Sequence, residues 1–186
     1  MDRKDLDTTL YLVTDSTYHT EESLLHTVEE ACKGGVTLVQ LREKNTGGRE
    51  YLDKAFKVKE ITDRYNVPLI IDDRVDVALA CDAAGVHVGS SDIPVAVARK
   101  LMGPDKIVGA TAKTVEAAQK AYEDGIHTIV TCDNGIAANA ALTKAKELGM
   151  TVVVTDHHMV PSIMDGENKT YILPPADAIL NPHKET

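Results

Sequence analysis

The sequence predicts an α/β protein whose strands run parallel. Short apolar runs rich in β-branched residues recur along all 186 residues, and segments with helical periodicity separate them. Most of these runs lack the alternation of a half-exposed strand, which is typical of strands buried on both faces of a parallel sheet. The eight expected strands are residues 10–14, 37–41, 68–71, 85–88, 107–110, 128–131, 151–155 and 178–180.

Most of the helices expected between these strands have a start or stop signal. A helix over 21–33 follows Thr20, whose hydroxyl can cap it, and ends at a Gly-Gly pair. Further helices are expected over 49–65, from Pro94 to Gly103, from Thr114 to Gly125, and over 136–148. Residues 159–177 are rich in Pro, Gly and polar side chains and predict a long loop.

Composition limits the classes of function. A formal charge of -9 and a pI near 5.2 exclude broad binding to nucleic acid, although a local basic cluster can still hold a small anion such as phosphate or sulfate. Three scattered cysteines, Cys32, Cys81 and Cys132, predict reduced thiols. The N-terminus is charged and no apolar run is long enough for a membrane helix, so we expect a cytoplasmic protein, either a monomer or a homodimer.

Polar residues that follow the second expected strand form the first candidate site. Gln40, Arg42 and Lys44 occupy every other position, so an extended segment directs all three to one side. An amide, a guanidinium and an ammonium group can together hold a phosphate or pyrophosphate. The spacing is equally compatible with a strand end closed by salt bridges.

Carboxylates follow the third and fourth expected strands. Asp73 and Asp92 would meet at the carboxyl edge of a parallel sheet, where one or two carboxylates suit Mg²⁺. Asp92 also precedes Pro94 closely, so the alternative is that it only caps the helix that starts there.

Five segments of the first two thirds of the chain closely resemble thiamine phosphate synthase. They are LYLVTD at 10–15, GGVTLVQLREK at 34–44, VPLIIDDRVDVALA at 67–80, GVHVGSSDIP at 85–94 and IVGATAKT at 107–114. That family is a (β/α)8 barrel that joins a pyrimidine pyrophosphate to a thiazole phosphate with Mg²⁺. The resemblance implies that Gln40, Arg42 and Lys44 hold the pyrophosphate, that Asp73 and Asp92 hold Mg²⁺, and that Thr111 contacts the pyrimidine. The chain departs from the family at Asp72, where Asn is usual.

The last third of the chain resembles a second family. GIHTIVTCDNGIAANAALTKAKELGMTVVVTDHH at 125–158 and LPPADAILNP at 173–182 are similar to DHH-superfamily phosphoesterases, closest to the RecJ exonucleases. The resemblance implies that Asp133, His157 and His158 are ligands of Mn²⁺ or Mg²⁺, with Asp156 completing the DHH motif. The DxDG motif of that family is missing.

The phosphate loops that thiamine phosphate synthases carry after the sixth to eighth strands are also missing. Together these absences favour an engineered chimera of residues 1–125 and 126–186: a scaffold without native catalytic activity, and so not an enzyme, that retains vestigial anion and metal sites. The alternatives are a residual thiamine phosphate synthase, which is a transferase, and an Mn²⁺- or Mg²⁺-dependent phosphoesterase.

The strand count decides the expected architecture. Eight parallel strands can close a (β/α)8-like barrel within a single domain of residues 1–186, with its last outer helices missing, because only residues 181–186 follow the last strand. The alternative is an open, doubly wound, Rossmann-like parallel sheet.

Overall fold

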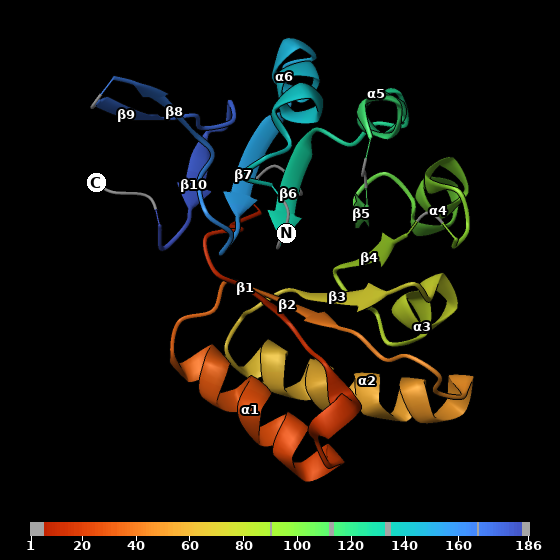
Figure 1. The fold of residues 1–186 in the computed structure, drawn as a ribbon. Helices are drawn as coiled ribbons and strands as arrows, with labels where there is room; N and C mark the ends of the chain where they lie inside the picture. The colour runs from red at the N-terminus through yellow and green to blue at the C-terminus, as the bar shows by residue number, and fades with distance from the viewer. Residues whose placement is uncertain (1–5, 90, 112–113, 133–134, 167, 184–186) are drawn as a thin grey trace. The chain divides into compact units, whose positions relative to one another are not determined.

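The computed structural model describes residues 6–89, 91–111, 114–132, 135–166 and 168–183. It divides into two compact units, Met1–Thr111 and Ala112–Thr186, which are coloured red to green and green to blue in Figure 1 and are described separately here. The prediction of a single domain over residues 1–186 stays a prediction.

The first unit is a sheet of five parallel strands in the order β1-β2-β3-β4-β5. Sequential order with parallel pairing requires a crossover between neighbouring strands, and helices supply these crossovers. The elements are β1 (Tyr11–Val13), the 3-10 helix η2 (Ser16–Tyr18), α1 (Glu21–Lys33), β2 (Leu38–Leu41), α2 (Gly48–Arg64), β3 (Leu69–Asp72), α3 (Val75–Ala80), β4 (Gly85–Val88), α4 (Val95–Met102) and β5 (Ile107–Ala110).

The predicted caps of α1 form as expected. The Thr20 side chain accepts a hydrogen bond from the backbone N–H of Ser23, and Gly35 after the helix has a φ of 94°. A positive φ is costly for residues with a Cβ, so the glycine allows the chain to turn into β2.

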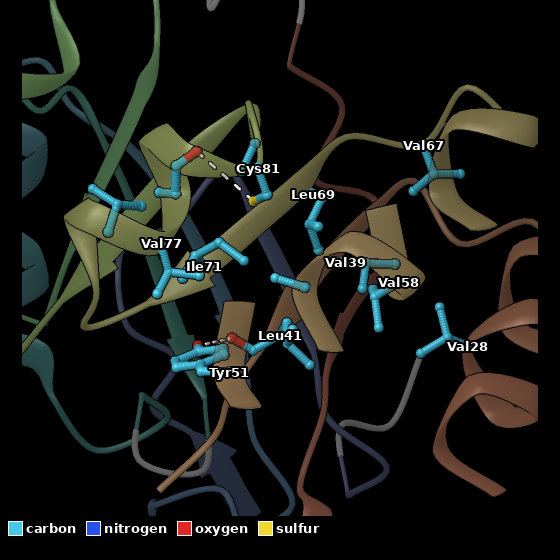
Figure 2. Packing of buried hydrophobic residues seen from close by; sticks show 14 of the residues in the cluster. Val28, Val39, Leu41, Tyr51, Val58, Val67, Leu69, Ile71, Val77 and Cys81 are labelled. Carbon is cyan, nitrogen blue, oxygen red and sulfur yellow. Dashed lines mark hydrogen bonds between the residues drawn. The ribbon is translucent and has the colours of Figure 1, made fainter. Parts of the chain in front are cut away.

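The core of the first unit lies between the sheet and helices α1, α2, α3 and α4, and Figure 2 shows part of it. All four residues of β2 and all four of β3 are buried, which explains why these strands lack apolar/polar alternation. Cys32 and Cys81 are free and buried as expected, and burial raises the pKa of both thiols. The side chain of Cys132 lies outside the described part of the structure.

The second unit contains a sheet of three parallel strands in the order β10-β7-β6, a hairpin and two helices. Its elements are α5 (Val115–Glu123), β6 (Thr128–Cys132), α6 (Asn139–Glu147), β7 (Thr151–Thr155), β8 (Ser162–Asp165), β9 (Asn168–Tyr171) and β10 (Ala178–Leu180). Strands β8 and β9 pair antiparallel.

The predicted long loop over residues 159–177 is therefore wrong. Asp165 and Gly166 stand where β8 ends, and Gly166 has a φ of 63°. An Asp-Gly pair between two short strands is a hairpin signal, which the density of Pro and polar residues obscured.

The parallel α/β prediction is confirmed, and all eight expected parallel strands are present to within two residues at either end. They form hydrogen-bonded sheets of five and three strands, so the described strands do not close one eight-stranded barrel. Helix α3 was not predicted, since six residues are too few to show a helical period. Among the described residues, none of the helices has the length and apolar character needed to cross a membrane.

Candidate active site at the strand ends of the first unit

Gln40 lies near the end of β2 and is held by two neighbouring strands. Its Nε2 donates to Oδ1 of Asp72 at 2.7 Å, and its Oε1 accepts from the hydroxyl of Tyr11 at 2.5 Å. Burial, together with the charge of Asp72, raises the pKa of Tyr11, so the phenol stays a donor. Both ends of the Gln40 amide are thus fixed, and its orientation is set before any ligand arrives.

Arg42 and Lys44 follow Gln40 on the same side and are surrounded by carboxylates. Lys44 Nζ lies 3.0 Å from Oδ2 of Asp72 and forms a second ion pair with Asp73. Arg42 Nε lies 3.9 Å from Asp72, and its Nη1 lies 3.4 Å from Asp15. The hydrogen bond with Asp73 raises the pKa of Lys44 although burial opposes it, so the ammonium group stays charged.

The structure brings the three predicted anion-binding residues together, and it also contains the salt bridges of the alternative interpretation. The two interpretations are compatible because the cations remain accessible: the Arg42 side chain is 37% exposed and that of Lys44 is 44% exposed. A phosphate group can bind such exposed cations in place of a carboxylate. A pocket of about 630 Å³ opens beside them, lined also by Ser16, His19 and Lys54.

Asp73 begins the loop after β3 in an unusual backbone conformation. Its φ is 63°, and its N–H donates to the carbonyl of His87 on β4 at 2.7 Å. A left-handed conformation is uncommon for a residue with a Cβ and is tolerated best by Asp and Asn. The bond to β4 fixes this conformation and directs the loop across the strand ends.

Asp92 lies beside Asp73. Its Oδ2 accepts from the N–H of Gly89 at 2.7 Å, so it closes the turn after β4. The alternative that Asp92 caps the following helix is wrong, because the N-cap of α4 is Pro94 and no side chain caps it. Burial raises the pKa of Asp92, and the hydrogen bond with Asp73 and the negative charge of Asp73 raise it further. The hydrogen bond from the Gly89 N–H and the positive charge of Lys44 lower it, but they do not outweigh the other effects.

Two carboxylates this close repel one another when both are ionised. A divalent cation removes that repulsion, and one or two carboxylates with substrate oxygens suit Mg²⁺. The donor set and the raised pKa of Asp92 therefore fit Mg²⁺.

His87 is a site residue that the sequence did not reveal. Its Nε2 lies 3.0 Å from Oγ1 of Thr111, the predicted pyrimidine contact, and burial lowers its pKa although nearby carboxylates oppose this. His87 pairs in register with Gly109 on β5, and a Cβ at Gly109 would lie 2.7 Å from His87 Nδ1. The only sequence signal was a histidine inside an apolar strand, because its pairing with Gly109 is known only from the strand register.

The second unit holds a separate cluster at the end of β7. Ligand atoms of Asp156, His157 and His158 all lie within 4.8 Å of one another. The Asp156 carboxylate accepts from the N–H of Ile136 at 2.8 Å and from Nδ1 of His158 at 2.7 Å, and the two histidine rings stack at 4.6 Å. The third predicted ligand, Asp133, lies outside the described residues.

Burial opposes ionisation of the Asp156 carboxylate. Hydrogen bonds from the backbone N–H groups of Ile136, His158 and His157 and from the His158 ring outweigh it, so the pKa of Asp156 lies far below its usual range.

A parallel α/β sheet that gathers an amide, two cations and a pair of carboxylates at its strand ends belongs to the class of α/β proteins whose polar site lies at the carboxyl ends of the strands. The family model described as thiamine monophosphate synthase matches residues 10–134, and the chain belongs to that family.

Curated relatives agree with this assignment. A thiamine-phosphate synthase of Caldanaerobacter subterraneus subsp. tengcongensis is 56% identical over 122 residues, covering 66% of this chain and 57% of the relative. Thiamine-phosphate synthase 2 of Streptococcus pneumoniae serotype 4 is 59% identical over 116 residues, covering 62% of this chain and 55% of the relative. The chain thus spans a little over half the length of these curated relatives.

A solved structure gives the corresponding fold. Thiamine phosphate pyrophosphorylase from Pyrococcus furiosus superposes with a TM-score of 0.69 and 32% identity, covering 82% of this chain and 76% of that one. The match supports the TIM-barrel-like α/β architecture predicted from the sequence.

These comparisons overturn the expectation of an engineered chimeric scaffold without native activity. Identities of 56% and 59% to thiamine-phosphate synthases are those of a family member, so the expectation that the chain is not an enzyme is wrong as well. That expectation relied on motifs missing from the last third, whereas the described site residues of the first five strands lie together. The comparisons lend no support to a DHH or RecJ component or to a chimeric origin.

Proposed function

We propose that this chain acts as a thiamine-phosphate synthase, a transferase that joins a pyrimidine pyrophosphate to a thiazole phosphate. The observation that carries the proposal is the convergence of Gln40, Arg42 and Lys44 with Asp73 and Asp92 at the ends of adjacent strands. Cations beside a carboxylate pair are the groups that a metal-bound pyrophosphate requires.

Each residue has a role in handling the pyrophosphate. Arg42 and Lys44 supply positive charge that offsets the charge developing on the departing pyrophosphate, and Gln40 donates from a fixed amide. Asp73 and Asp92 would hold Mg²⁺, which when bound neutralises pyrophosphate oxygens. Thr111, supported by the neutral ring of His87, would contact the pyrimidine.

The proposal predicts that the purified chain forms thiamine phosphate from the two substrates in the presence of Mg²⁺. Arg42→Ala/Lys44→Ala should lose at least about 100-fold in kcat/KM, since two charge contacts to the departing group are removed. Lys33→Ala is the matched control, because Lys33 is exposed on α1 and pairs only with Glu30 among the ion pairs described. Equal activity in the double variant and the control would overturn the proposal.

The second unit carries a further proposal, that Asp156, His157 and His158 bind Mn²⁺ or Mg²⁺. Their closely spaced nitrogen and oxygen donors support it. Calorimetric titration of Mn²⁺ into the wild type and into His157→Ala/His158→Ala tests it, and equal heats would exclude the site. Binding of free phosphate or sulfate, a monomeric or homodimeric state and a cytoplasmic location remain predictions.

A further inference from the structure

A buried ion pair lies beside the proposed anion site, and the function proposed above does not use it. Glu43, between Arg42 and Lys44 in the sequence, has a side chain that is 2% exposed. Its Oε2 lies 2.7 Å from Nζ of Lys54, which is itself 10% exposed and comes from the buried face of α2. Burying two charges is costly unless the pair is well formed and further hydrogen bonds satisfy it.

Further polar contacts of Glu43 reach the loop after β1. Ser16 donates from its hydroxyl to Glu43 Oε1, and Thr46 Oγ1 lies 3.5 Å from Glu43 Oε2. Ser16 belongs to η2, whose N-cap is Asp15, and Asp15 pairs with Arg42. The carboxylate of Glu43 therefore links η2, the loop after β2 and helix α2.

The three consecutive side chains contact different elements. Arg42 and Lys44 contact the carboxylates at the strand ends, whereas Glu43 contacts the helix. β2 itself ends at Leu41, and the chain bends at Lys44. Because this segment lies beyond the strand, the contacts of Glu43 with Lys54 and Ser16 hold the part of the chain that carries both cations.

We propose that Glu43 is a positioning residue for the pyrophosphate site: held by Lys54 and Ser16, it fixes the segment that directs Arg42 and Lys44 towards the ligand. The inference rests on the proposed function, because it assigns the pair to the same pyrophosphate site. A purely structural pair would contribute to folding and leave pyrophosphate affinity unchanged.

The test uses a double variant that removes both charges. Glu43→Met/Lys54→Met keeps similar side-chain volumes and leaves no unpaired buried charge, so it should fold with a melting temperature near that of the wild type. The control is Lys57→Met on the same helix, because Lys57 is 48% exposed and pairs with Glu21 at the surface. Glu43→Gln is a second variant, in which the single amide oxygen can accept from Lys54 while the amide NH2 can donate to the Ser16 hydroxyl.

Calorimetric titration of inorganic pyrophosphate with Mg²⁺ into each folded variant is the readout. The double variant should bind about 10-fold more weakly than the wild type, with Glu43→Gln between them and Lys57→Met unchanged, since small displacements of charged groups reduce affinity strongly. Loss of affinity at an unchanged melting temperature supports positioning, because a merely structural role would not produce it.

Two results would overturn the proposal, and they differ. If the wild type binds pyrophosphate and the double variant binds it equally well, positioning by Glu43 is excluded while the proposed function stands. If the wild type itself does not bind Mg²⁺-pyrophosphate, the proposed function and the inference fail together.

Discussion

Gln40 and Asp72 are joined across β2 and β3 by a hydrogen bond of 2.7 Å from the amide Nε2 to the carboxylate Oδ1. The other oxygen of Asp72 faces Lys44 at 3.0 Å and Arg42 at 3.9 Å, and the side chain is 7% exposed. One buried carboxylate thus contacts all three groups proposed to bind pyrophosphate. In the proposed function it would compete with the pyrophosphate for these groups.

The first prediction concerns that competition. Asp72→Asn keeps an acceptor for Gln40 but removes the negative charge beside Arg42 and Lys44, so the affinity for Mg²⁺-pyrophosphate should rise about 3- to 10-fold. The free energy of unfolding should fall by about 1–2 kcal/mol, because charged hydrogen bonds are lost. Calorimetry and urea unfolding measure the two effects. Weaker pyrophosphate binding in the variant would show that Asp72 orients the cations rather than competing for them.

The second prediction concerns the carboxylate pair. Burial and the neighbouring Asp73 raise the pKa of Asp92, so Asp92 stabilises the fold below the usual Asp pKa and loses that contribution as pH rises through its raised pKa. In EDTA at pH 7, Asp92→Asn should therefore melt at a higher temperature than the wild type. The difference should shrink as pH falls.

Mg²⁺ should reverse the order of the two melting temperatures, because a ligand stabilises only the protein that binds it. Added Mg²⁺ should raise the melting temperature of the wild type and leave that of Asp92→Asn unchanged. Asp76→Asn is the control, since Asp76 pairs with Arg74 and its pKa is lowered by that bond. An equal Mg²⁺ shift in Asp92→Asn would exclude Asp92 as a ligand.

Much of the fold could be predicted from the sequence because buried parallel strands are visible in it as short apolar runs. Complete burial on both faces makes β2 and β3 apolar apart from Gln40 and Asp72, so both strands are visible as apolar runs. The hairpin of β8 and β9 shows no such run, because all four residues of β8 are exposed. Its only local signal was the Asp-Gly turn.

The sequence predicts those residues of the candidate site whose place depends only on their spacing along one strand. The alternation places Gln40, Arg42 and Lys44 on one side of the chain, and the resemblance to thiamine phosphate synthase assigns the pyrophosphate to them. The supporting residues were not predictable, because their roles depend on long-range contacts: Lys54 meets Glu43 only once α2 packs on the sheet, and His87 fits only because Gly109 lies opposite. Sequence spacing contains no information about such pairs.

The third prediction concerns the hydroxyl of Tyr51, a fully buried residue of α2 (Figure 2). It lies 2.7 Å from the carbonyl of Leu41 and 3.0 Å from the carbonyl of Asp72. The Tyr51 hydroxyl therefore contacts the ends of both β2 and β3. Tyr51→Phe keeps the ring and removes this tie, which should cost about 1–2 kcal/mol in the free energy of unfolding.

Tyr65→Phe is the matched control for this effect. The Tyr65 hydroxyl donates to Oε1 of Glu29 at 3.2 Å in a partly exposed contact, so its loss should cost less than about 0.5 kcal/mol. Urea unfolding of both variants gives the comparison. Equal costs would show that the Tyr51 hydroxyl contributes nothing specific at the strand ends.

The last prediction concerns Asp156 in the second unit. Its side chain is 1% exposed, and its two oxygens accept from the N–H groups of Ile136 at 2.8 Å and His158 at 3.0 Å. Asp156→Asn has only one accepting oxygen, so one buried donor loses its partner at a cost of about 2–3 kcal/mol in the free energy of unfolding. Asp165→Asn, on the exposed strand β8, should cost almost nothing.

The same substitution gives a pH test with a defined sign. Because the pKa of Asp156 is lowered, its carboxylate contributes stability above the usual Asp pKa and loses it as pH falls towards the lowered value. The stability difference between wild type and Asp156→Asn should therefore be constant near neutral pH and shrink only in strong acid. Urea unfolding of the full chain between pH 7 and acid measures this dependence. A difference that disappears already near neutral pH would assign the effect to a histidine, because only the imidazole titrates there.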